Sequence, residues 1–247
     1  MTTAKSGGAP ADDPLWGAEN RDVKAANIVQ CLELVTELDL SQLSCVDIGC
    51  GSGGISYHLA PSFKSVCGVD PAPWQRWNDY TAKQPNLQFI AGSADSLSIE
   101  SCSVDIVICN QVYEHVPSPT ALIAQIQRIL KPGGTCYFAG PNLLFPIEPH
   151  VYWPFVHWIP RSWALALLRT FSPEKEQMLD AYSTTYWTLT RWLGEFQIQD
   201  AVPLLMKHRA QTSGGLWQLF RPVPKRVLHL LSFLSPGFVF VLTKPKS

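Results

Sequence analysis

The segment from Val46 to Gly54, Val-Asp-Ile-Gly-Cys-Gly-Ser-Gly-Gly, constrains the fold of this 247-residue chain more than any other segment. It overlaps a short apolar run, and helical spacing of apolar residues begins at Gly54. Glycines at such a junction allow a tight turn and let another group come close to the backbone. The segment therefore predicts a buried strand over 44–48, a glycine-rich loop and a helix that begins at residue 54.

Apolar runs and helical segments alternate through the first 140 residues. Strands are predicted over 44–48, 65–69, 87–91, 104–109 and 135–139, and helices over 20–38, 54–59 and 119–130. Continuous apolar strands that alternate with helices indicate an α/β fold, with a doubly wound parallel sheet covered on both faces. Beyond residue 140 we expect helices over 162–171 and 173–182, the end of a covering helix over 189–195, strands over 196–205 and 237–243, and an interrupted helix over 215–234.

An acidic residue, Asp70, ends the next predicted strand after the glycine loop. An acid at this place can accept hydrogen bonds from both hydroxyls of a ribose. Gly49, Gly51 and Gly54 also satisfy the spacing G-x-G-x-x-G, which by itself is a weak signal for a dinucleotide. A nucleotide site is therefore predicted, and a tight turn without a ligand is the simpler alternative.

Asp47 distinguishes between two kinds of nucleotide ligand. It lies two residues before the first glycine, where a carboxylate would repel a pyrophosphate and attract an ammonium or a sulfonium. With this acid, Val46–Gly53 resembles motif I of class I S-adenosylmethionine (SAM) methyltransferases. The resemblance continues in order through four more segments, which are Val69-Asp70-Pro71, Gly92–Asp95, Val104–Asn110 and Leu130–Gly134. It covers residues 42–140 well and residues 187–243 loosely.

The resemblance implies a Rossmann-like sheet of seven mostly parallel strands with an antiparallel last strand, and a set of contacts to SAM. The implied residues are Asp47, Gly49, Cys50, Gly51, Ser52 and Gly53 for the methionine end, Asp70 and Pro71 for the ribose, Ser93, Ala94 and Asp95 for the adenine, and Asn110 and Gln111 for the sulfonium side.

The segment from Tyr113 to Pro117 follows the fourth predicted strand. It resembles the Glu-His-Val-Pro segment of small-molecule methyltransferases related to the ubiquinone-biosynthesis O-methyltransferases. Methyl transfer to oxygen or nitrogen can require a general base, which is most often histidine. His115 and Glu114 are therefore candidate catalytic residues, and orienting the loop is their alternative role. Some of these relatives carry a further Glu of a proposed metal site where this chain has Gln111, so we expect no metal.

Residues 141–186 form an aromatic insertion after the fifth core strand, longer than a crossover requires. We expect a lid and an acceptor pocket there; the alternative is a local satellite core. The candidate substrate-binding residues are Tyr113, Asn142, Tyr152, Trp153 and Trp158, and His150 is a second candidate base.

The chain after Asp200 contains seven Lys and Arg residues and no Asp or Glu. Arg221, Lys225 and Arg226 lie among apolar and aromatic residues, a combination typical of a helix on a membrane surface. Attraction of an anionic acceptor and a simple solvated face are the alternatives. We expect a hydrophobic or lipid-like acceptor, and contact of this region with a membrane.

Composition excludes several classes of protein. The chain is 46% apolar and 16% charged, which argues against disorder, and its net charge of −1 argues against nucleic-acid binding. Apolar segments are too short to span a bilayer, the seven cysteines lack metal-ligand spacing, and no secretory h-region is seen. We expect a cytoplasmic protein with a flexible tail over 1–19 and one domain over 20–247.

These observations predict SAM-dependent methylation of a small acceptor, first at oxygen, with carbon and nitrogen as alternatives. Two other classes of function compete with this prediction. One is a nicotinamide-dependent Rossmann oxidoreductase, and the other is a SAM-binding scaffold without catalysis.

Overall fold

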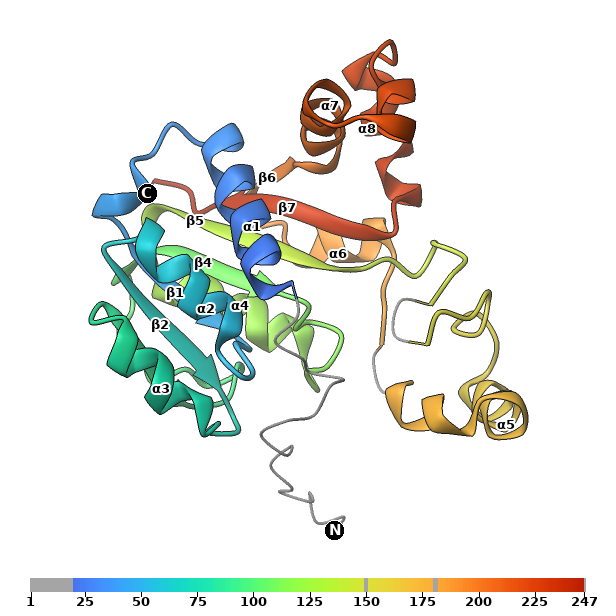
Figure 1. The fold of residues 1–247 in the computed structure, drawn as a ribbon, viewed down its shortest axis with the longest axis horizontal. Coiled ribbons are helices and arrows are strands. Elements are labelled where there is room, and N and C mark those ends of the chain that lie inside the picture. The colour runs from blue at the N-terminus through green and yellow to red at the C-terminus, as the bar shows by residue number, and fades with distance from the viewer. Residues whose placement is uncertain (1–19, 149–150, 180–181, 247) are drawn as a thin grey trace.

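The computed structural model describes residues 20–148, 151–179 and 182–246, around a seven-stranded sheet of order β3-β2-β1-β4-β5-β7-β6 (Figure 1). The strands are β1 (Ser44–Ile48), β2 (Ser65–Asp70), β3 (Leu87–Ala91), β4 (Val104–Asn110), β5 (Leu130–Pro141), β6 (Gln197–Asp200) and β7 (Gly237–Thr243). Strands β1 to β5 pair in parallel, whereas β7 is antiparallel to both of its neighbours, β5 and β6. The predicted Rossmann-like sheet with an antiparallel last strand is confirmed.

Helices surround this sheet. They are α1 (Arg21–Val35), α2 (Gly54–Leu59), α3 (Arg76–Lys83), α4 (Pro119–Ile129), α5 (Arg161–Phe171), α6 (Tyr186–Trp192), α7 (Val202–Thr212) and α8 (Lys225–Leu231). Five short 3-10 helices join them: η2 (Leu40–Gln42), η3 (Ala60–Ser62), η4 (Pro173–Met178), η5 (Gly215–Phe220) and η6 (Ser232–Leu234).

Two apolar clusters hold the helices against opposite faces of the sheet. Successive strand residues point to opposite faces, so Ile106 and Ile108 of β4 join α1 and α2, while Val107 and Cys109 join α4 and α6. The same alternation in β1 sends Cys45 to the α1 and α2 face. Asp47 points to that face as well, and its carboxylate therefore lies beneath the first turn of α2.

The structure corrects three local predictions. The expected strand over 196–205 ends at Asp200, and Val202 begins α7, because Pro203 suits a first helical turn and the apolar residues follow helical spacing. Residues 131–134, expected as a turn, belong to the irregular start of β5. The helix expected over 173–182 is the 3-10 helix η4, which ends at Met178.

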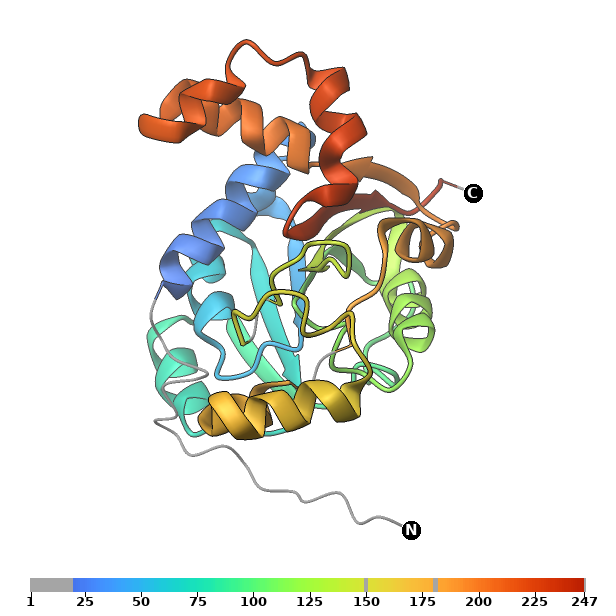
Figure 2. The same cartoon turned by 90° about the vertical axis from the view of Figure 1, so that its right-hand side faces the viewer.

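Two insertions flank the carboxyl end of the parallel strands, which faces the viewer in Figure 2. The segment between β5 and α6 carries α5 and lies below this end in the view. The segment between β6 and β7 carries α7, η5 and α8 and lies above it. The insertions thus bound the edge of the sheet at which the glycine loop lies. The tail expected over 1–19 lies outside the described residues.

Candidate functional site

A large cleft opens at the carboxyl end of the sheet. It has a volume of about 1740 Å³, and is lined by the glycine loop, the ends of β2 and β4, helix α1 and both insertions. Sites for one small ligand usually measure about 300–1,000 Å³. The cleft is therefore large enough for a nucleotide-sized cofactor together with a second molecule.

The glycine loop uses its own amides to hold itself against β2. The N–H groups of Gly49 and Cys50 donate to the carbonyl of Val69 (2.7 and 3.1 Å), and the N–H of Gly51 donates to the Asp70 carboxylate (2.9 Å). A pyrophosphate site needs free N–H groups directed at the ligand. Because these three amides are already used, the loop is poorly suited to a dinucleotide.

The glycines of the loop have different roles. Gly51 has φ +53°, and a Cβ there would meet nothing within 4 Å, so its backbone borders open space in the cleft. A Cβ on Gly49 would lie 2.6 Å from Val112, and one on Gly53 would lie 2.5 Å from the Phe89 ring. Gly51, which also lines the cleft, is thus the loop position that lets a ligand approach, whereas Gly53 makes room for packing and is not among the lining residues.

Asp47 places a buried negative charge under the loop. Its side chain is 3% exposed, and its Oδ2 accepts a hydrogen bond of 2.6 Å from Ser56. The pKa of Asp47 is raised to about 7: burial is the main cause, Ser56 and Arg21 oppose the rise, and the nearby Asp70 adds a smaller contribution to it. A carboxylate in this setting is stabilised by an added cation, such as the ammonium of a bound amino acid.

Asp70 ends β2 at the rim of the cleft. One of its carboxylate oxygens accepts from Gly51 and the other from the N–H of Ala72 (3.0 Å). Each oxygen retains further acceptor capacity, so the carboxylate can still bind two ribose hydroxyls. Pro71 and Trp74 lie beside it in the lining, and the Trp74 indole N–H has no hydrogen-bond partner among the described residues.

The expected adenine segment divides. Ser93 and Ala94 line the cleft next to Gly92, whereas Asp95 is exposed and does not belong to the lining. At the end of β4, Asn110 and Gln111 line the cleft as expected, and Gln111 adopts φ +60°. The cofactor residues predicted from four separate segments are thus brought to one surface, with Gly53 and Asp95 outside it.

The candidate catalytic segment after β4 is partly buried. His115 is exposed and lines the cleft, whereas Glu114 is 1% exposed and does not. Tyr113 is also buried, and its hydroxyl donates to the carbonyl of Pro141 and accepts from the N–H of Thr184 (3.3 Å). Tyr113 thereby ties β4 to the two ends of the insertion, a structural role rather than the expected contact with substrate.

The insertion after β5 brings one expected residue to the cleft. Tyr152 lines it, is 75% exposed and adopts φ +56°, a strained conformation for a non-glycine residue. Trp153 packs in a small core around Val151 and Leu168, which the sequence left as the alternative, and Trp158 donates to the carbonyl of Leu143 outside the cleft. His150 lies outside the described residues.

Asn142 is a tether between the insertions. Its side-chain amide donates to the carbonyls of Phe233 (2.7 Å) and Ser235 (2.9 Å), and its Oδ1 accepts from the N–H of Leu144 (3.1 Å). All of these partners belong to the backbone. Asn142, expected to bind substrate, therefore fixes the position of the 201–236 insertion over the sheet.

The sequence did not single out the wall that α1 and the 201–236 insertion add to the cleft. Arg21 and Ile28 contribute from α1, and Leu205, Met206 and Arg209 from α7. The helical spacing of 202, 205, 206 and 209 was present in the sequence, but the expectation of a strand to residue 205 concealed it. On the opposite side, the exposed Glu174 of η4 also lines the cleft.

Comparison with known proteins favours SAM over a dinucleotide as the cofactor. Residues 46–138 match the protein family described as "Methyltransferase domain". This segment carries a methyltransferase domain. The chain is 31% identical over 134 residues to a ubiquinone biosynthesis O-methyltransferase of Xanthomonas oryzae pv. oryzae, a match that covers 51% of this chain and 56% of that protein. The chain thus spans about half the length of the curated relatives that it matches.

Two solved methyltransferase structures align with more than nine-tenths of this chain. Geranyl diphosphate C-methyltransferase from Streptomyces coelicolor A3(2), solved with S-adenosyl-L-homocysteine, aligns with a TM-score of 0.55 at 14% identity, over 91% of this chain and 77% of that one. The 1,6-didemethyltoxoflavin-N1-methyltransferase of Burkholderia thailandensis, also solved with S-adenosylhomocysteine, aligns with a TM-score of 0.55 at 14% identity, over 94% and 81%. Similarity at this level establishes the fold.

The geometry fits S-adenosylmethionine as the cofactor of the methyltransferase domain. Asp47 and the open side of Gly51 suit the methionine end, Asp70 the ribose, and Ser93 with Ala94 the adenine. Among the described residues no group of three or more His, Cys, Asp and Glu side chains could hold a metal ion. Within the same part of the chain, every helix is too short or too polar to cross a membrane.

Proposed function

We propose that the protein is an S-adenosylmethionine-dependent methyltransferase that acts on a small, hydrophobic or lipid-like acceptor, with oxygen as the methylated atom. The observation that carries the proposal is the continuity of the cleft. The residues suited to SAM occupy one part of it, and a largely apolar wall from α7 and α8 borders the rest.

The preference for oxygen rests on the similarity to ubiquinone biosynthesis O-methyltransferases, which is confined to about half of the chain. The structural neighbours include enzymes named for carbon and for nitrogen methylation, so the fold itself does not select the atom. Methylation at carbon or nitrogen is therefore the second candidate.

The protein's own residues would contribute mainly by positioning. When bound, SAM supplies an electrophilic methyl group on its sulfonium. Asp47 and Asp70 hold the two ends of the cofactor, and the walls of the cleft exclude water and align the acceptor for in-line attack, which is a large part of catalysis. His115, exposed at the end of β4, would take the proton of an acceptor hydroxyl.

The two insertions would complete the acceptor pocket. Tyr152 from the first insertion reaches the cleft, and we propose that this segment acts as a lid. Glu114 would orient His115 from its buried position. We propose a mechanism without a metal ion, because the uncharged Gln111 at the end of β4 stands where some relatives carry a Glu of a proposed metal site.

We also propose that the 201–236 insertion rests on an anionic membrane, so that the protein acts at a membrane surface in the cytoplasm. Its outward side chains include Leu216 and Leu230, which are 80% and 70% exposed, close in sequence to Arg221, Lys225 and Arg226. Exposed leucines beside cations and without acids suit an anionic lipid surface. Equal partition of the protein onto anionic and neutral liposomes would contradict this part of the proposal.

The cofactor part of the proposal is tested by calorimetric titration of SAM, S-adenosylhomocysteine and NADH into the protein and into an Asp70→Ala variant. We expect micromolar binding of the two adenosyl ligands, at least tenfold weaker in the variant, and no binding of NADH. Methyl transfer from labelled SAM to a panel of hydrophobic phenols, acids and amines then identifies the atom. Binding of NADH alone would support an oxidoreductase, and SAM binding without transfer to any acceptor would support a scaffold.

A further inference from the structure

We propose that the acceptor is an amphipathic anion, whose carboxylate or phosphate group is bound by Arg209 and whose apolar part lies along α7. This inference rests on the proposed function, and it names the chemical class of the acceptor.

Arg209 faces the cleft because of its place on α7. Val202, Leu205, Met206 and Arg209 occupy positions i, i+3, i+4 and i+7, which lie on one face of a helix, and all four line the cleft. The wall of this part of the cleft is thus apolar up to the second half of α7, where it ends in a guanidinium. An apolar surface that leads to one cation is complementary to an apolar molecule with one negative group.

The guanidinium of Arg209 is held in place without a counter-ion. It lies 5.2 Å from the centre of the Trp217 ring, a cation–π contact that joins α7 to η5. In the described part of the chain no carboxylate forms an ion pair with it, and no acid follows Asp200 in the sequence. Arg209 therefore keeps its donors for a ligand, and a guanidinium binds carboxylates and phosphates through two parallel hydrogen bonds.

The charge of Arg209 reaches the floor of the cleft. Burial raises the pKa of Tyr137 in β5, and the positive charge of Arg209 opposes this rise. Tyr137 also lines the cleft, between the glycine loop on β1 and the antiparallel strand β7. The lining of the cleft thus continues from Arg209 past Tyr137 to the proposed cofactor site.

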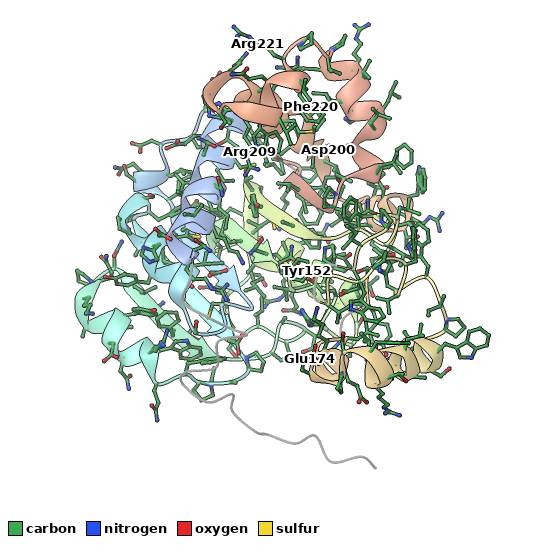
Figure 3. The ribbon with its side chains drawn as sticks, turned by 45° about the vertical axis from the view of Figure 1, so that its right-hand side comes forward. Tyr152, Glu174, Asp200, Arg209, Phe220 and Arg221 are labelled. Carbon is green, nitrogen blue, oxygen red and sulfur yellow. The ribbon has the colours of Figure 1, made fainter. Side chains whose placement is uncertain are left out.

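The two ends of the cleft also differ in the charge of their lining residues. Arg209 and Phe220 lie at the α7 end, whereas Tyr152 and Glu174 lie toward α5 (Figure 3). A negative group is repelled by Glu174 and attracted to the α7 end, which leaves the methyl-accepting group of the molecule for the cofactor site.

The test uses four probes on the full-length protein saturated with S-adenosylhomocysteine. Dodecyl phosphate, dodecanoate, dodecyl maltoside and inorganic phosphate are titrated by calorimetry below their micellar concentrations. The variants are Arg209→Gln and the matched control Arg191→Gln, because Arg191 is exposed on α6 and does not line the cleft. Arg209→Lys, which keeps the charge, is the second variant at the site.

We expect at least one of the two anionic dodecyl probes to bind more tightly than dodecyl maltoside and inorganic phosphate. Its affinity falls about tenfold or more in Arg209→Gln, less in Arg209→Lys, and by less than about twofold in Arg191→Gln. Comparison of dodecyl phosphate with dodecanoate shows which oxyanion the site prefers.

The inference would be overturned by no binding of either anionic dodecyl probe, by equal binding of dodecyl maltoside, or by equal weakening in the Arg209→Gln and Arg191→Gln variants. Inorganic phosphate as tight as dodecyl phosphate would also overturn it, since the apolar wall would then contribute nothing. The titration of S-adenosylhomocysteine itself distinguishes this failure from failure of the proposed function. If that ligand binds and the anionic probes do not, only the acceptor class is wrong.

Discussion

The hydroxyl of Ser56, in the first turn of α2, donates to the carboxylate of Asp47, near the end of β1, over 2.6 Å. Asp47 is thereby fixed under the glycine loop, in a place where burial raises its pKa to about 7. A buried acid that titrates near neutrality makes both ligand binding and folding depend on pH.

Binding of S-adenosylhomocysteine should weaken below pH 7. The ligand's ammonium favours the ionised form of Asp47, so the proton must leave when the ligand binds, and the affinity should fall about tenfold for each pH unit below 7. Calorimetry from pH 6 to pH 8, in two buffers with different ionisation enthalpies, measures both the affinity and the proton release. An Asp47→Asn variant should bind weakly at every pH; the same pH profile in both proteins would assign the titration to another group.

Without ligand, Asp47 should cost stability at alkaline pH. Its pKa in the folded protein lies above the usual 3.8, so the folded state holds the proton more tightly, and stability falls as the pH rises from about 4 to 7. Asp47→Asn should therefore be more stable than the wild type at pH 8, by on the order of 2 kcal/mol, and nearly equal to it at pH 4. Urea unfolding at the two pH values measures this difference, and a variant that is less stable at pH 8 would contradict the assignment.

Gly51 and Gly215 provide a matched pair for the cofactor site. Both have positive φ (+53° and +69°), and a Cβ at either would meet nothing within 4 Å. Alanine at either position should therefore cost about 1 kcal/mol of stability through backbone strain alone. Only Gly51→Ala places a methyl group in the cleft, so it alone should weaken S-adenosylhomocysteine binding, by about tenfold or more. Equal binding by the two variants would place the cofactor away from the loop.

Asn142→Ala should loosen the 201–236 insertion. The substitution leaves the carbonyls of Phe233 and Ser235 without their donor, at a cost of about 2–3 kcal/mol. Denaturant unfolding measures the stability, and amide hydrogen exchange over residues 225–236 shows where it is lost. Asn78→Ala on the exposed face of α3 is the control. Faster exchange that is spread evenly over the sheet would argue against a local tether.

His115→Gln tests the proposed general base. Glutamine keeps a polar side chain at the cleft but cannot hold the proton, so the rate of methyl transfer should fall about 100-fold at saturating substrate. The affinity for S-adenosylhomocysteine should stay unchanged. Single-turnover transfer to the acceptor found in the screen measures the rate. A loss of less than about threefold would leave His115 the role of orienting the loop.

The sequence was sufficient for the core of the fold, and most of the residues that it proposed for the cofactor line one cleft. Strands 44–48, 87–91 and 237–243 were predicted at the bounds that the structure shows, because buried strands are local apolar runs with clear ends. Asp47 and Asp70 could be interpreted as a cofactor pair because each is fixed to the end of a strand, and parallel strands bring their carboxyl ends to one edge.

Residues beyond the core were harder to interpret. Trp153 and Tyr152 are neighbours in an aromatic segment, yet Trp153 joins a satellite core and Tyr152 reaches the cleft. Periodicity cannot separate them, because the segment has no regular structure and its contacts come from distant parts of the chain. The same holds for Asn142, whose partners lie about ninety residues away.

By itself, the sequence determined the order of strands and helices and the edge of the sheet at which the glycine loop lies, because these depend on local patterns and on chain direction in a parallel sheet. Only the tertiary structure decided that the amides of the glycine loop donate to β2, that Asp47 is buried enough to titrate near neutrality, and that Arg209 of α7 lines the cleft. Each of these depends on which groups from distant segments come into contact, and burial and electrostatic fields are fixed by those contacts alone.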